Sequence, residues 1–119
     1  MKNLLRPDLA FRLNGRLWVE TPDDRFMGIG RLELLTLIQE HGSISKAAQQ
    51  MGMSYKRAWD LVASLNAQSA TPLVQTQTGG KRGGGAEVTP EGQQLIQEFR
   101  ELQERFQEFL AAEAARLLL

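Results

Sequence analysis

The sequence contains no cysteine, and only one of its 119 residues is a histidine. The lack of cysteine excludes disulfide bonds and thiolate zinc sites, which fits a reducing compartment such as the cytoplasm. His41 has no second histidine or cysteine with which to complete a metal site. We therefore interpret His41 as a surface or capping residue and expect neither a metal nor a cofactor.

Long apolar runs are also missing. No window reaches the roughly 18 apolar residues that a membrane span needs, and the N-terminal stretch MKNLLRPDLAFRLNG carries scattered charges. We expect a soluble, cytoplasmic protein with no membrane partner. A nucleophile, a base and an orienting group cannot be assembled from these residues, so we expect no catalytic residues and no enzyme activity.

The sequence has no net charge, because 14 basic residues balance 14 acidic ones. The charges are nevertheless unevenly distributed. Residues 41–86 have a net charge of +4, and residues 87–119 have a net charge of −4. This asymmetry favours a negatively charged partner for the middle of the chain.

The stretch from Gly42 to Asn66, GSISKAAQQMGMSYKRAWDLVASLN, predicts two short helices. Ser43 or Ser45 can cap the first, and Ser54 can cap the second, which runs from Tyr55 to about Asn66. Small residues in the first helix allow a close helix crossing, and Gly52 can adopt the positive φ that ends it. The pattern is typical of a helix-turn-helix, although an ordinary pair of antiparallel helices remains an alternative.

The second helix has two faces. Its apolar residues recur at helical spacing and should face the core: Ala58, Leu61, Val62 and Leu65. The outward residues, available to a DNA major groove, are Tyr55, Lys56, Arg57, Asp60 and Ser64. We expect Trp59 to pack in the core, and Trp18 to pack the N-terminal hairpin onto the domain.

A second pair of elements follows Pro72. The runs Leu73–Gln77 and Ala86–Val88 read as strands, joined by a glycine-rich tip that contains Lys81 and Arg82. A β-hairpin after the second helix of a helix-turn-helix is a wing, here residues 73–88. Its glycines allow the backbone to approach DNA, and its cations suit phosphate or a narrow minor groove. The tip is no phosphate-binding P-loop, because Arg82 stands where that motif needs Ser or Thr.

These segments resemble a known family. GSISKAAQQMGMSYKRAWDLVASLN followed by PLVQTQTGGKRGGGAEVTPEG is similar to the N-terminal domain of the ModE-type molybdate-responsive transcriptional regulators. That winged-helix group is related to the LysR-type domain, and the similarity covers residues 9–110. The resemblance implies that the domain binds operator DNA as a dimer. In that family a separate C-terminal region senses molybdate, so we expect this polypeptide not to sense it.

The N-terminal part should form a hairpin over residues 9–20. Two alternating runs, Leu9–Leu13 and Arg16–Glu20, flank Asn14-Gly15, which is a strong turn signal. After a turn at Thr21–Asp24, the apolar pattern predicts a first core helix over Met27–Glu40. Three helices would thus occupy residues 27–66, within a single domain of residues 1–119.

The final helix should span residues 90–118, with Thr89 as its N-cap and Pro90 at its first position. Spacings of 4, 3, 4 and 3 separate the members of an apolar stripe. We expect this stripe to form the interface of a homodimer: Leu95, Phe99, Leu102, Phe106 and Phe109. The alternative is one amphipathic helix that packs on its own domain.

The sequence thus predicts a mainly α, α+β fold, a winged helix-turn-helix with an N-terminal β-hairpin and a long C-terminal dimerisation helix. We expect a regulator whose homodimer binds double-stranded DNA. The residues expected to read bases are Ser54, Tyr55, Lys56 and Arg57. Phosphates would be held by Ser43, Ser45 and Lys46, and Lys81 and Arg82 would anchor the wing. The alternatives are an interaction module that modulates a partner regulator without reading DNA, and a fragment of a longer molybdate sensor.

Overall fold

The computed structural model describes residues 1–77 and 85–118. The chain divides into two compact units, where the sequence led us to expect one. The larger unit is residues 18–99, and the smaller unit combines residues 1–17 with the chain from Arg100 onward. Helix α4, Pro90–Leu118, contributes its first turns to the larger unit and the remainder to the smaller one.

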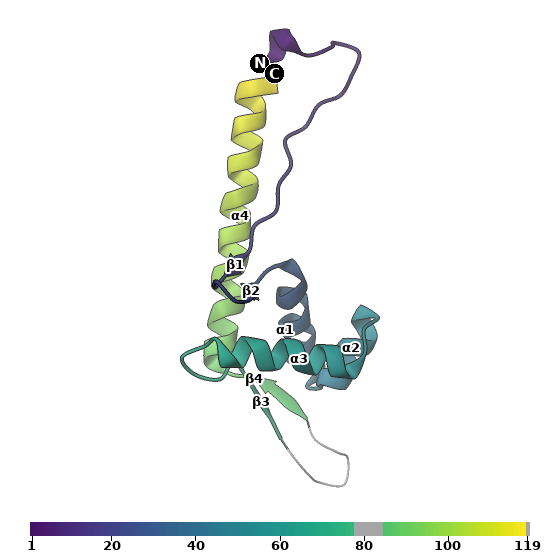
Figure 1. Cartoon of the computed structure of the whole chain (residues 1–119), viewed down its shortest axis with the longest axis vertical. Helices are drawn as coiled ribbons and strands as arrows, with labels where there is room; N and C mark the ends of the chain where they lie inside the picture. The colour runs from purple at the N-terminus through teal and green to yellow at the C-terminus, as the bar shows by residue number, and fades with distance from the viewer. Residues whose placement is uncertain (78–84, 119) are drawn as a thin grey trace. The chain divides into compact units, whose positions relative to one another are not determined.

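Three helices form the centre of the larger unit: α1 (Ile29–His41), α2 (Ile44–Met51) and α3 (Tyr55–Ala67). Figure 1 shows them packed together, with β3 and β4 extending from them. The core consists mainly of side chains that are fully buried, among them Leu34, Leu35, Ile38, Ala47, Ala58 and Leu65. The alanines keep the helices close, as the sequence predicted.

The turns between these helices have specific local causes. Gly42 ends α1 at φ 66°, and Gly52 ends α2 at φ 68°, both in the left-handed region that favours glycine. The Ser43 hydroxyl accepts from the Lys46 amide at 3.1 Å, and the Ser54 hydroxyl accepts from the Arg57 amide at 3.1 Å. Ser43 rather than Ser45 is therefore the cap of α2, and Ser54 caps α3 as predicted.

Strands β3 (Val74–Thr76) and β4 (Ala86–Val88) are the described part of the wing. They pair antiparallel, with Val74 opposite Val88. The Ala86 amide also donates to the Gly42 carbonyl at 2.9 Å, which attaches β4 to the end of α1. The wing is thereby fixed to the three-helix core at its base.

The start of α4 is held against the same strands. The Thr89 hydroxyl accepts from the Gly92 amide at 3.1 Å and lies 2.8 Å from the Pro72 carbonyl, to which it donates. A Cβ on Gly92 would lie 2.4 Å from the Leu73 carbonyl oxygen, so only glycine fits this approach. Thr89 is the N-cap that the sequence predicted.

The N-terminal hairpin lies at other residues than predicted. Strands β1 (Val19–Glu20) and β2 (Arg25–Met27) pair antiparallel around the Thr21–Asp24 turn, and residues 9–18 form no strand. The prediction over residues 9–20 is wrong because Gly15 does not adopt the positive φ that an Asn-Gly hairpin turn requires. The predicted turn at Thr21–Asp24 is instead the one that joins the two strands, with the Thr21 amide donating to the Asp24 carbonyl at 2.8 Å.

In the smaller unit, a short 3-10 helix (Lys2–Leu4) leads into a chain that runs along α4, as Figure 1 shows. The Gln103 side-chain amide donates to the Leu17 carbonyl at 3.3 Å. A Cβ on Gly15 would lie 3.1 Å from Cζ of Phe106, so the segment lies directly against that ring. Packing against α4 thus replaces strand pairing in this segment. No helix in the described part of the chain is long and apolar enough to span a membrane.

Candidate nucleic-acid interface

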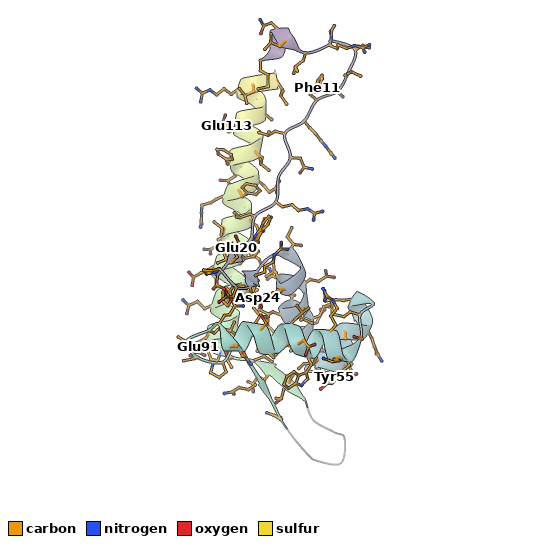
Figure 2. The ribbon with its side chains drawn as sticks, viewed as in Figure 1. Phe11, Glu20, Asp24, Tyr55, Glu91 and Glu113 are labelled. Carbon is orange, nitrogen blue, oxygen red and sulfur yellow. The ribbon has the colours of Figure 1, made fainter. Side chains whose placement is uncertain are left out.

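Helix α3 presents a polar face that the core does not use. Ala58, Val62 and Leu65 are buried, whereas Tyr55 is 53% exposed and both Lys56 and Arg57 are exposed. Figure 2 labels Tyr55 at the start of this helix. The cap at Ser54 places these side chains in the first turn of α3, the part of a recognition helix that contacts base edges.

Three of the four predicted base-reading residues line one shallow hollow. Its volume is about 250 Å³, and it is lined by Ser54, Lys56, Arg57, Asp60 and Leu61. The Lys56 ammonium lies 2.9 Å from the Asp60 carboxylate, and both side chains are more than half exposed. An exposed ion pair of this kind adds little to stability, so the fold does not depend on it. Ser54, Lys56 and Arg57 thus share this hollow, whereas Tyr55 is exposed outside its lining.

A polar network fixes the opposite flank of α3 to the first hairpin. Ser64 donates to the Asp24 carboxylate at 2.5 Å and accepts from the Arg31 guanidinium at 2.9 Å. Gln68 donates to the Arg25 carbonyl at 3.0 Å. The Ser64 hydroxyl, followed by the Arg25 amide, lowers the pKa of the Asp24 carboxyl below its ordinary value. These bonds set the position of α3 on α1.

A second hollow of about 240 Å³ adjoins this network. Arg25, Arg31 and Arg57 all contribute to its lining. Burial lowers the pKa of Arg31; Asp24 opposes that shift, while Arg25 and Arg57 add to it. Glycine and apolar residues complete the lining: Gly28, Ile29, Gly30, Met51, Met53 and Leu61. The arginines nevertheless give this hollow a cationic lining, and arginine is well suited to bind phosphate oxygens.

The predicted phosphate-binding residues separate into three groups. Ser45 and Lys46 are exposed on α2, and Ser43 is half-buried because its hydroxyl caps the helix. Lys81 and Arg82 lie outside the described residues. Helix α2 therefore leaves Ser45 and Lys46 exposed, while the Ser43 hydroxyl is engaged as the cap of the helix.

The sequence analysis did not identify three residues in or beside this surface. Trp59 is 46% exposed, so the prediction that it packs in the core is wrong: Ala58 and Val62 fill the inward positions of that turn. Arg31 lies on the buried face of α1 with Leu34, Leu35 and Ile38, and this charged residue on an apolar stripe was the available signal. No pattern in the sequence identified Arg25.

The burial of the apolar stripe of α4 changes along the helix. Phe99 is only 3% exposed within a single chain, and its place in a dimer interface stays a prediction. Its ring is one of the buried apolar side chains of the chain. Leu95, Leu102 and Phe106 are half-buried, and Phe109 is 57% exposed. The exposed part of the stripe thus lies toward the C-terminal end of the helix.

Comparison with known families identifies the fold. Residues 29–93, more than half of the chain, match the bacterial regulatory helix-turn-helix proteins of the lysR family. The chain belongs to this family. The match begins at α1 and ends in the first turn of α4, so it contains the helix-turn-helix and the wing. The chain thus carries a LysR-type DNA-binding domain, which belongs to regulators and not to enzymes.

Several curated proteins are similar to this chain. The transcriptional dual regulator ModE of Escherichia coli K12 is 51% identical over 67 residues, which are 56% of this chain and 26% of ModE. ModE of Azotobacter vinelandii, a molybdenum transport protein, is 33% identical over 108 residues, which are 91% of this chain and 40% of that protein. The molybdenum-pterin-binding protein MopB of Rhodobacter capsulatus is 51% identical over 70 residues, or 59% of this chain and 26% of MopB. The resemblance to ModE regulators is confirmed, although the chain spans well under half the length of these relatives.

A solved structure supports the same fold. A mutant of ZitR from Lactococcus lactis aligns with 88% of this chain and 69% of its own, with a TM-score of 0.53 and 15% sequence identity. The LysR-type chain described here therefore has the predicted winged helix-turn-helix fold. Within the described residues, no group of three histidine, cysteine, aspartate or glutamate side chains is placed to hold a metal ion.

Proposed function

We propose that this chain is a ModE-like transcriptional regulator whose homodimer binds operator DNA. The observation that carries the proposal is the first turn of α3, where Ser54, Lys56 and Arg57 line one open hollow on a helix that is firmly held by the core. Helices presented in this way dock in the major groove. There, arginine and lysine recognise guanine, while contacts with phosphates position the protein.

The electrostatic part of the proposal rests on four cations. If Lys46, Lys56, Lys81 and Arg82 each contact a phosphate in both protomers, about eight counterions are released, and log affinity should fall with log salt at a slope near −7. Replacement of Lys81 and Arg82 together should weaken binding to every DNA sequence and flatten this slope. Affinity that is independent of salt would contradict the proposal.

The dimer is supported by the smaller unit. Leu102 and Phe106 are half-buried there and Phe109 is mostly exposed. Phe11 and Leu13 add exposed apolar side chains from the N-terminal segment, at 45% and 39%. A second copy of the chain would cover these residues, and the resulting two-fold axis would place two recognition helices on DNA half-sites about 34 Å or a multiple of it apart.

The experiment that tests the proposal is selection of bound sequences from a random DNA pool, followed by titration of the selected site. We expect a pseudo-palindromic site, and Arg57→Ala should reduce discrimination against single-base changes by about tenfold or more. Arg105→Ala removes the same charge from an exposed position on α4 and should leave discrimination unchanged. No enriched sequence would favour the alternative of an interaction module that does not read DNA.

A further inference from the structure

Trp59 is a large aromatic residue on the surface of the recognition helix. Its side chain is 46% exposed, and Tyr55, one helical turn earlier, is 53% exposed. Residues four apart lie on the same side of a helix, so the two rings form one aromatic stripe. Neither ring is required to fill the core, because Ala58, Val62 and Leu65 are the buried residues of α3.

The helix geometry assigns this stripe to the flank beside the wing. Trp59 and Asn66 are seven residues apart, or two turns, and therefore lie on nearly the same side of α3. Asn66 donates to the Val74 carbonyl at 2.9 Å and accepts from the Leu73 amide at 2.8 Å. The Trp59 flank is thus the one from which β3 departs.

The other flank is polar. Arg57 and Ser64 are also seven residues apart, and Ser64 is bonded to Asp24 and Arg31. The Lys56–Asp60 ion pair lies between the two flanks, on the exposed face. The recognition helix therefore has a cationic flank at Arg57 and an aromatic flank at Trp59, both continuous with the surface that we propose faces DNA.

We propose that Trp59 reads thymine in the major groove by packing its indole ring on the 5-methyl group of the base. This inference rests on the proposed function. The thymine methyl is the apolar group that base edges present in the major groove. An indole offers a broad apolar face and one N–H donor, so it suits this methyl better than it suits a pattern of acceptors. The exposed Lys56, which lies between this stripe and the Arg57 flank, favours DNA over an apolar protein partner.

Two substitutions make Trp59 directly observable, because the chain has only two tryptophans. In a Trp18→Phe variant, Trp59 is the single tryptophan, and its emission should shift and lose acrylamide quenching when the selected DNA site is added. In the matched Trp59→Phe variant, Trp18 should show no such change. A shift of Trp59 emission with protein concentration alone would overturn the proposal in favour of a protein contact.

The contact itself is tested by removing the methyl group from DNA. Replacing each thymine of the selected site by deoxyuracil should weaken wild-type binding by about three- to tenfold at one position in each half-site. Trp59→Ala should bind the thymine and deoxyuracil sites equally, because the two changes remove the same contact. Thermal melting followed by circular dichroism checks that both Trp59 variants fold, and Trp59→Phe should retain part of the thymine preference.

The two proposals fail in different ways. If the wild-type chain selects no DNA sequence, the proposed function fails and the thymine contact fails with it. If the wild-type chain binds a selected site but deoxyuracil costs the same affinity in wild-type and Trp59→Ala proteins, DNA reading stands and the role of Trp59 is refuted.

Discussion

The Asn66 side chain forms hydrogen bonds with both the backbone amide and the backbone carbonyl of Val74. The Asn66 side-chain nitrogen donates to the Val74 carbonyl at 2.9 Å, and its side-chain oxygen accepts from the Val74 amide at 3.2 Å. The last turn of the recognition helix is thereby attached to the first strand of the wing. This attachment couples the position of the wing to that of α3.

Replacing Asn66 by alanine should destabilise the larger unit. The half-buried backbone groups of Leu73 and Val74 would lose their partners, at a cost of about 2 kcal/mol in the free energy of unfolding. Urea denaturation measures this cost. Gln49→Ala, at an exposed position on α2, is the control and should change stability little. Equal stability of the Asn66 variant and the wild type would show that the attachment is not structural.

Gly92→Ala should destabilise the junction between the wing and α4. The added methyl would lie 2.4 Å from the Leu73 carbonyl oxygen and 2.6 Å from Cγ1 of Val88. Relief of such overlap requires α4 to shift, at about 1–3 kcal/mol. Gly30→Ala is the matched control, because nothing lies within 4 Å of a Cβ there. That change should be neutral, or stabilise α1 by up to about 1 kcal/mol, in thermal melts.

The stability of the larger unit should fall in acid, partly because of Asp24. Its pKa is lowered in the folded state, chiefly by the hydrogen bond from Ser64. The stability that this hydrogen-bonded carboxylate contributes is therefore complete above the pKa of the unfolded carboxyl, about 3.9. It is lost as the pH falls through the lower pKa of the folded state. Urea unfolding between neutral and strongly acidic pH should show a shallower acid decline for Asp24→Asn. Asp23→Asn, at the adjacent exposed position, should retain the wild-type decline.

Phe109→Asp should dissociate the proposed homodimer. Phe109 is 57% exposed in a single chain, so the substitution should leave the fold of each chain intact. A charge in an apolar interface is costly, and loss of the second recognition helix should lower operator affinity about 100-fold or more. Sedimentation equilibrium and DNA titration measure the two effects, with Gln107→Ala as the control. A wild-type chain that stays monomeric at high micromolar concentration would refute the dimer.

Local sequence determined the helix-turn-helix and its caps. Gly42 and Gly52 end helices in a conformation that other residues adopt only with strain, and Ser43, Ser54 and Thr89 provide the hydroxyl caps of the helices that follow. Each of these signals acts over a few residues, so each could be read without the fold. The wing strands and the start of α4 were predicted for the same reason.

Tertiary packing decided the features that depend on contacts between distant residues. Asn14-Gly15 is a local hairpin signal, but Gly15 lies against Phe106, 91 positions later in the chain, and no strand forms there. A heptad stripe shows which side of α4 is apolar, yet only the fold shows that Phe99 is buried within the chain while Phe109 is exposed. Trp59 likewise lies outside the core, because Ala58 and Val62 already fill the space beneath that turn of α3. Local sequence by itself determined the helices and their caps, and the competition among distant side chains for the same space decided where the first hairpin forms and which surfaces remain exposed.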